Sequence, residues 1–149
     1  LQPFAALDLA RYAGRWYEIA RFPNRHQRTC AQVTEDYAPR TDGNFDVRGS
    51  CPDPAGGRPT VREGGARLDG PAGLSGGLNA GRPVFRRTVF VLDVSEDYGV
   101  AVIGEPRRKY GWIMARAPQV SPAAYARAVA VLARNGYFTE LLEPVAPRR

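Results

Sequence analysis

Hydrophobic and polar positions alternate in short runs along most of the chain. About eight runs follow one another at the roughly 8 to 12 residue spacing that is typical of antiparallel sandwiches and barrels. Turn residues such as Asp42-Gly43 and Asp69-Gly70-Pro71 separate them, because glycine adopts positive φ and proline presets its own φ. The predicted strands cover residues 16–22, 31–38, 44–49, 60–68, 74–78, 84–94, 98–104 and 110–116.

A helical pattern follows the strands. Ser121-Pro122 is typical of a helix cap and first position, and Asn135-Gly136 is typical of a helix end. Between them Tyr125, Val129 and Leu132 recur at i, i+4 and i+7, so we expect one helix over 121–135 with a single apolar face. A last short run, 137–142, is expected to dock on the sheet before the chain ends.

The number of strands bears on the architecture. Eight strands in an open sheet leave two exposed edges, whereas closure pairs every backbone group and leaves room for side chains or one small ligand. A closed barrel is therefore favoured over a sandwich. We expect one all-β domain over 1–149: an eight-stranded antiparallel up-and-down barrel over 14–116, a C-terminal α-helix packed outside it over 121–135, and a C-terminal strand and tail over 137–149.

Composition and charge narrow the function. The 149 residues include 16 glycines and 13 prolines. The net charge is +6, and the cationic side chains are almost all arginine. No apolar run is long enough to cross a bilayer, so we expect a soluble chain. The short clusters Arg107-Arg108-Lys109 and Arg148-Arg149 are typical of a solvated loop and a tail, so we expect no nucleic-acid partner. The dispersed charge instead suits anionic lipid head groups.

The two cysteines indicate a compartment. Cys30 and Cys51 flank a segment with the turn 41–44 near its centre, and a hairpin there would bring the two sulfurs together. A disulfide is the favoured hypothesis, which implies an exported protein; two buried thiols remain the alternative. The sequence starts at Leu1 without methionine or a leader, which leaves open a signal peptide or a lipidated cysteine upstream.

Motifs for catalysis are weak. Residues 73–77 match the G-x-S-x-G pattern of serine hydrolases, but that pattern needs a strand before it and a helix after it. His26 is the one histidine and precedes Ser75, so the order of a hydrolase triad is impossible. Residues 76–81 lack the lysine and hydroxyl of a phosphate loop, and the histidine and cysteines have no spacing typical of a metal site. We therefore expect that the protein is not an enzyme and that it binds neither a cofactor nor a metal ion.

Alternation also predicts which side chains face the barrel interior. These positions form the core of a filled barrel or the wall of a hollow one. A carboxylate directed inward needs a partner or water, which favours the hollow alternative slightly. The predicted inner sets are Trp16, Glu18 and Ala20; Val33, Glu35 and Tyr37; and Tyr110, Trp112 and Met114.

Gly14-Arg15-Trp16-Tyr17 resembles the first signature of the lipocalins, specifically of bacterial members of the family. Residues 91–104 resemble the second signature, and 112–118 the third. The resemblance implies that residues 1–13 close the barrel base and that Gly14, Trp16 and Arg116 are structural, with the arginine stacked on the indole and bonded to carbonyls beneath it. The run 74–81 departs from the family because its glycines have weak strand propensity.

By resemblance the other end is open and binds a fatty acid, a lysophospholipid or a similar amphiphile, in the bacterial periplasm or outer membrane, as a monomer or homodimer. A lipid anchor upstream would add membrane association. Two alternatives stay open: a lipocalin enzyme that uses a reactive thiol, and binding of a tetrapyrrole or retinoid. The expected wall is Glu18, Ala20, Val33, Glu35, Tyr37, Phe45, Val47, Ala66, Val91, Tyr110, Trp112 and Met114, and the expected rim is Arg25, Arg28, Arg86 and Arg87.

Overall fold

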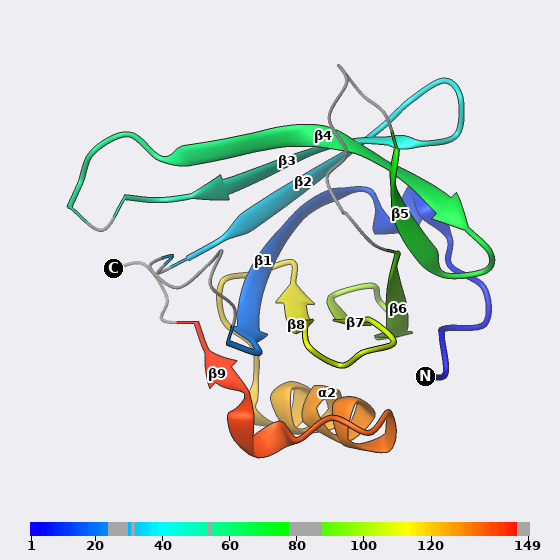
Figure 1. Cartoon of the computed structure of the whole chain (residues 1–149), viewed down its shortest axis with the longest axis vertical. Helices are drawn as coiled ribbons and strands as arrows, with labels where there is room; N and C mark the ends of the chain where they lie inside the picture. Colours follow the sequence, from blue (N-terminus) through cyan, green and yellow to red (C-terminus); the bar gives the residue numbers. More distant parts are fainter. Residues whose placement is uncertain (24–29, 31, 54, 78–87, 146–149) are drawn as a thin grey trace.

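The strands form a closed antiparallel barrel (Figure 1). The computed structural model describes residues 1–23, 30, 32–53, 55–77 and 88–145. Strand β1 pairs with both β8 and β2, which closes the sheet, so the predicted barrel is confirmed and the sandwich is wrong. The strands are β1 (Gly14–Arg21), β2 (Thr34–Pro39), β3 (Phe45–Cys51), β4 (Thr60–Asp69), β5 (Gly73–Gly77), β6 (Val89–Val94), β7 (Val100–Gly104) and β8 (Gly111–Ala115).

The two ends of the barrel differ. A short helix, α1 (Leu9–Tyr12), precedes β1, and the Asp8 side chain caps it by accepting bonds from two backbone N–H groups. We call this end the closed end. Since neighbouring strands are antiparallel, the connections after β1, β3, β5 and β7 lie at the opposite end, which we call the open end.

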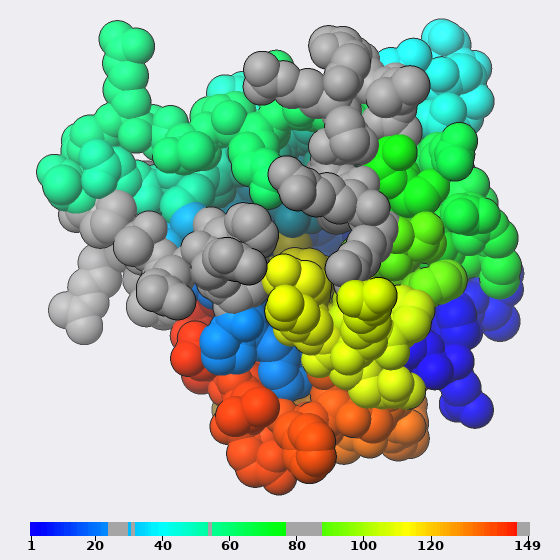
Figure 2. All heavy atoms as spheres, viewed as in Figure 1, coloured from blue at the N-terminus to red at the C-terminus, as the bar shows by residue number. Residues whose placement is uncertain are grey.

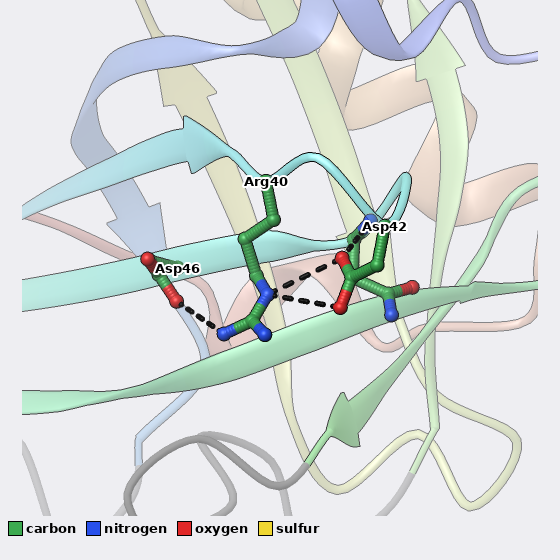
Figure 3. Close-up of polar contacts among 4 residues, drawn as sticks. Arg40, Asp42 and Asp46 are labelled. Atoms are coloured by element: carbon green, nitrogen blue, oxygen red, sulfur yellow. Dashed lines mark hydrogen bonds and ion pairs between the residues drawn. The ribbon is translucent and has the colours of Figure 1, made fainter.

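The turn between β2 and β3 lies at the closed end, and Figure 3 shows the polar contacts of Arg40, Asp42 and Asp46 within it. The predicted Asp42-Gly43 turn is present, with Gly43 at a φ of 84°. Arg40 Nε donates to the Asp42 carboxylate at 3.1 Å, and Arg40 Nη1 donates to Asp46 at 3.1 Å. One arginine therefore joins the turn to the following strand.

Apolar side chains form two clusters, one on each side of the sheet. The inner cluster draws on α1 and the strands and includes Trp16, Phe45 and Val91. The outer cluster includes Ile113 together with Leu132 of α2 (Pro122–Arg134), so it lies between the sheet and the helix. The barrel therefore has an apolar interior and a separately packed outer wall.

Helix α2 covers the outside of the barrel beside β6 and β7 (Figure 1). The Ser121 hydroxyl accepts a bond from Ala124 N at 3.1 Å, which confirms the predicted cap. The buried face is centred on Ala128, Val131 and Leu132. The predicted stripe lies partly at its edge, because Tyr125 and Val129 are only half-buried. None of the helices in the described ranges is long and apolar enough to cross a membrane.

The segment after α2 docks on β1. A strand forms within the predicted range 137–149, but it is β9 (Glu143–Pro144), which pairs with Ala20 and Arg21. Residues of the predicted run instead include the 3-10 helix η1 (Thr139–Leu141). Tyr137 explains the difference, because its hydroxyl is bonded to the 105–110 connection and the chain must turn before it reaches the edge of β1.

Strand β5 forms despite its glycines. It pairs with β4 along Gly73–Gly76, and with β6 at Gly73 and Leu74. A Cβ atom at Gly73 would lie 2.3 Å from the Asp69 carbonyl oxygen, so glycine permits this close approach. Ser75 lies inside the strand and accepts a bond from Arg67, which confirms that it is not on a hydrolase elbow.

Candidate functional site

Trp16 and Arg116 seal the closed end. The Arg116 guanidinium carbon lies 3.7 Å from the centroid of the Trp16 ring system. The same guanidinium donates to four carbonyl oxygens, those of Arg11, Tyr12, Arg15 and Tyr98. Trp16 Nε1 donates to Tyr12 O at 2.8 Å. The predicted stacking and bonding of Arg116 are therefore present, and this end is occupied by structural side chains.

An aromatic layer lies above this seal. The Tyr12 ring is 5.2 Å from Trp16 and 5.0 Å from Tyr37, and Tyr37 is 5.4 Å from Phe45 in an edge arrangement. These four side chains are almost fully buried. Tyr37 and Phe45 were expected along the wall, and the structure places them in the floor of the interior.

Inner-facing side chains continue toward the open end. Trp112 is half-buried, which leaves part of its indole surface uncovered. Figure 2 shows the yellow atoms of β7, β8 and their connection at the surface of the molecule, above the orange atoms of α2. The predicted wall residues that belong to the inner cluster are Tyr37, Phe45, Val47, Ala66, Val91 and Met114, with Trp112 packed against it.

The open end carries a stacked aromatic pair. Tyr110 and Trp112 have ring centroids 6.1 Å apart and an interplanar angle of 8°, and both are half-buried. An accessible aromatic surface of this kind suits an apolar ligand. The predicted rim arginines Arg25, Arg28, Arg86 and Arg87, and also His26, lie outside the described residues.

Glu35 places a carboxyl group inside the barrel. It is half-buried on β2, and the Tyr37 hydroxyl donates to Glu35 Oε2 at 3.2 Å. Desolvation raises the pKa of Glu35, and the Tyr37 hydrogen bond opposes this rise. The same burial holds the Tyr37 pKa well above its ordinary value, so the tyrosine stays protonated and remains a donor.

A second polar pair lies further along β1. Arg21 Nη1 is 3.1 Å from Glu18 Oε1, and Arg21 Nη2 donates to Cys30 O at 2.8 Å. The Glu18 side chain is fully buried and that of Arg21 is 9% exposed. Since Glu18 pairs with Met114 and Arg21 pairs with Trp112, both lie on the inner face.

A bulge in β1 produces this arrangement. The register with β8 shifts between Glu18 and Ala20, and Ala20 pairs with Ile113. Ala20 packs in the outer cluster with Ile19, so the prediction that Ala20 faces the interior is wrong. One extra residue reverses the alternation beyond it, which directs Arg21 inward. Val33 is buried, and its carbonyl accepts a bond from Glu18 N.

A disulfide joins Cys30 to Cys51, with their Cα atoms 5.4 Å apart. The predicted pairing is confirmed, and the alternative of two buried thiols is wrong. These are the two cysteines of the chain, so the thiol nucleophile of the enzyme alternative is occupied. The disulfide fixes the segment before β2 to the end of β3, beside the carbonyl that Arg21 contacts.

Several site features were missed by the sequence reasoning. Tyr12 carries no motif of its own, and Arg21 appears on the inner face only because of the bulge. Glu105 is buried and its carboxylate accepts bonds from the backbone N–H groups of Arg107, Lys109 and Tyr110. The available signal was the pair Glu105-Pro106 directly after the apolar strand β7, because an acid at the start of a tight connection can accept bonds from backbone N–H groups that follow it.

A polar groove lies on the outside of β1, β2 and β3. Its volume is about 350 Å³, and it is lined by charged or hydroxyl side chains that include Arg15, Asp36 and Arg48. Arg15 and Asp36 form an ion pair across it at 2.8 Å. Such a lining does not suit an apolar ligand. Within the described residues no group of His, Cys, Asp and Glu side chains is arranged to hold a metal ion.

Comparison with known proteins agrees with this architecture. The model of the lipocalin-like domain family matches residues 7–147. The chain is 34% identical over 131 residues to outer membrane lipoprotein Blc of Escherichia coli strain K12, covering 87% of this chain and 73% of that protein. It is 31% identical over 140 residues to temperature-induced lipocalin-1 of Arabidopsis thaliana, with coverages of 88% and 74%.

A solved structure supports the fold independently. The cockroach allergen Per a 4 superposes with a TM-score of 0.76 at 18% identity, covering 98% of this chain and 92% of that one. At that identity the likeness bears on the barrel alone. The family match extends over nearly the whole described chain and includes its closed-end signature, Gly14, Trp16 and Arg116. The chain belongs to the lipocalin family.

Proposed function

We propose that this lipocalin binds one small amphipathic lipid inside its barrel and carries or stores it without covalent chemistry. A fatty acid or a lysophospholipid is the expected ligand. The observation that carries the proposal is the inner face near the open end, where Trp112 and Tyr110 stack but keep accessible surface. Met114 and Val91 continue this apolar lining toward the floor.

Burial of the acyl chain supplies the affinity in this proposal. Each methylene transferred from water contributes about 0.8 kcal/mol, before the cost of ordering the ligand is subtracted. Micromolar binding therefore needs no special polar contact. The polar groups inside the barrel then orient the head group and select among lipids.

Arg21 is the described cation that best fits an anionic head group. It lies on the inner face beside Trp112, and its charge is balanced by Glu18 at 3.1 Å. A lipid carboxylate or phosphate near this pair would share the guanidinium donors. A chain extending from there passes Trp112 and Met114 toward the aromatic floor.

The proposed location is the bacterial envelope. The Escherichia coli relative is named as an outer membrane lipoprotein, and the Cys30–Cys51 disulfide suits an oxidising compartment. Membrane association through a lipid anchor stays a prediction, and so does a monomeric or homodimeric state.

Tryptophan fluorescence during a lipid titration tests the binding proposal. We expect a saturable change with a long-chain fatty acid or a lysophospholipid. The Trp112→Phe variant should lose this change while it retains the emission of Trp16, because Trp16 is sealed at the closed end. Absence of a saturable change across several lipid classes would contradict the proposal.

A paired comparison tests the head-group role of Arg21. We expect the wild type to bind a fatty acid more tightly than the fatty alcohol of equal length. The double variant Glu18→Gln, Arg21→Gln keeps the wall neutral, so it should lose most of this preference and still bind the alcohol. If the wild type and the double variant preferred the fatty acid over the alcohol to the same extent, Arg21 would not be the residue that selects the head group.

The two alternative functions have distinct signatures. A tetrapyrrole or a retinoid would bind tightly and compete only weakly with fatty acids, and it would be recognised by absorption in the visible for the tetrapyrrole or in the near ultraviolet for the retinoid. A thiol-dependent enzyme would require a titratable cysteine in the native protein. We expect none, because both cysteines are in the disulfide.

A further inference from the structure

Two large apolar side chains project from the segment that follows α2. Phe138 is 74% exposed and Leu141 is 60% exposed, compared with 37% for Val61 and 36% for Leu68. One turn of η1 joins the two projecting residues, with Leu141 N donating to Phe138 O. Their neighbour Tyr137 packs in the outer cluster. The fold therefore anchors this segment while directing two large apolar groups into solvent.

Cationic side chains lie on the two elements that pack against this segment, α2 and the connection between β7 and β8. Arg134 ends α2, and Arg107 and Lys109 are exposed on the connection between β7 and β8. Arg108 Nε donates to Asn135 O, which holds this connection against the end of α2. The elements that meet here therefore carry four cationic side chains. The exposed acidic side chains of the segment after α2 are two, Glu140 and Glu143, so the positive charges outnumber the negative ones.

The connection that carries these cations is rigidly supported. The buried Glu105 carboxylate accepts bonds from Arg107 N and Lys109 N. The Tyr137 hydroxyl accepts a bond from Glu105 N at 2.9 Å and donates to Tyr110 O at 2.7 Å. The apolar residues and the cations are therefore positioned by one hydrogen-bonded unit.

This unit lies beside the open end. The connection from β7 to β8 leaves the barrel there and leads into Trp112. A surface that binds this unit therefore approaches the part of the barrel where a ligand would enter.

We propose that Phe138 and Leu141, together with Arg107, Lys109 and Arg134, form a docking surface for an anionic phospholipid membrane. Aromatic and aliphatic side chains flanked by cations match the bilayer interface, because the apolar groups enter below the head groups while the cations meet phosphates. Two projecting side chains provide too little apolar area for a stable protein interface, and a nucleic acid would leave them uncovered.

Vesicle sedimentation tests this surface. We expect the purified protein to bind vesicles of phosphatidylcholine mixed with phosphatidylglycerol, and to bind phosphatidylcholine alone much more weakly. Phe138→Ser with Leu141→Ser should weaken partitioning by about tenfold or more. Arg107→Gln with Lys109→Gln should weaken partitioning to the mixed vesicles by a similar factor. Added salt should reduce vesicle binding by the wild type, because it screens the charges.

Matched variants provide the controls. Val61→Ser with Leu68→Ser removes two other exposed apolar residues, and Arg48→Gln with Arg67→Gln removes two other cations. Both should bind mixed vesicles like the wild type. In a Phe138→Trp variant the tryptophan emission should shift to shorter wavelength when mixed vesicles are added, which places this residue in the interface.

The outcomes separate this proposal from lipid binding inside the barrel. The Phe138→Ser, Leu141→Ser variant should keep its affinity for a lysophospholipid in solution, because neither residue belongs to the inner cluster. Unchanged vesicle binding by this folded variant would overturn the docking surface. A wild type that is dimeric, with this variant monomeric, would also overturn it, because a second copy would then cover the surface.

Discussion

Arg116 lies where four main-chain carbonyls and one indole ring converge. A planar guanidinium can bond several acceptors while its face covers an aromatic ring, which explains why arginine occupies this position. This role was predictable because Trp16 and Arg116 belong to short local motifs. The inward position of Arg21 was not, since it depends on where one extra residue is accommodated in β1.

Replacement of Arg116 tests the seal. We expect Arg116→Ala to reduce the free energy of unfolding by about 2–4 kcal/mol, because four main-chain carbonyls lose this donor and the indole loses its cover. Arg116→Lys should recover less than half of this loss, since an ammonium group cannot form the same fork. Urea unfolding measures both values. Arg48→Ala is the control, and it should lower the free energy of unfolding by less than about 1 kcal/mol because Arg48 belongs to an exposed ion pair. An equal loss of stability in Arg116→Ala and Arg48→Ala would show that Arg116 does not seal the closed end.

Glu35 gives a prediction about pH. Desolvation raises its pKa in the folded protein above the ordinary value of 4.5. As pH rises past that value, the unfolded chain releases this proton while the folded chain retains it, so the Glu35 contribution to stability falls. The Glu35→Gln variant should therefore gain stability relative to wild type as pH increases, until the folded pKa is passed. Urea unfolding from acidic to neutral pH measures the difference, and parallel stability curves would contradict it.

The strands show which features of an element a sequence can predict. Alternation and turn residues locate β1 to β8 because both signals are local. The displacement of Ala20 to the outer cluster and the late start of β9 were not predictable in this way, since they follow from tertiary contacts of Ile113 and Tyr137. Glycine-rich β5 forms because its neighbours supply backbone partners.

The disulfide is the clearest test of the β2–β3 region. Cys30 and Cys51 are separated by 21 residues, and a crosslink over a loop of this length typically stabilises a protein by about 3 kcal/mol. Cys30→Ser with Cys51→Ser should lose about this amount in urea unfolding. Thiol titration of the native wild type should detect no free cysteine. Two reactive thiols in the folded protein would contradict the pairing.

Tyr137 provides a test of the unit beside the open end. Tyr137→Phe removes the hydroxyl that bonds Glu105 N and Tyr110 O, while the ring keeps its stacking on Phe22. We expect a loss of about 1–2 kcal/mol in the free energy of unfolding, together with faster amide hydrogen exchange in residues 105–110. Tyr125→Phe, on the edge of the outer cluster, should change neither measurement. Unchanged exchange in Tyr137→Phe would show that this hydroxyl does not hold the connection.

At the scale of the molecule, the barrel is divided along its axis. The closed end is filled by Trp16, Tyr12 and their aromatic neighbours, while the half-buried Tyr110 and Trp112 lie at the open end. The family resemblance predicted this division, since it implied a base closed by residues 1–13 and an open opposite end, whereas the strand count predicted only that the barrel is closed and has an interior of limited width. The identity of the ligand depends on few inner side chains and is less readable from sequence.

Native mass spectrometry of the purified chain, mixed with a lysophospholipid, tests the central claim most directly. The account predicts one bound lipid per chain at saturation, with the disulfide intact. It also predicts that the Phe138→Ser, Leu141→Ser variant binds the same single lipid. Absence of a stoichiometric complex with lysophospholipids and with fatty acids, in a protein shown to be folded, would contradict the account.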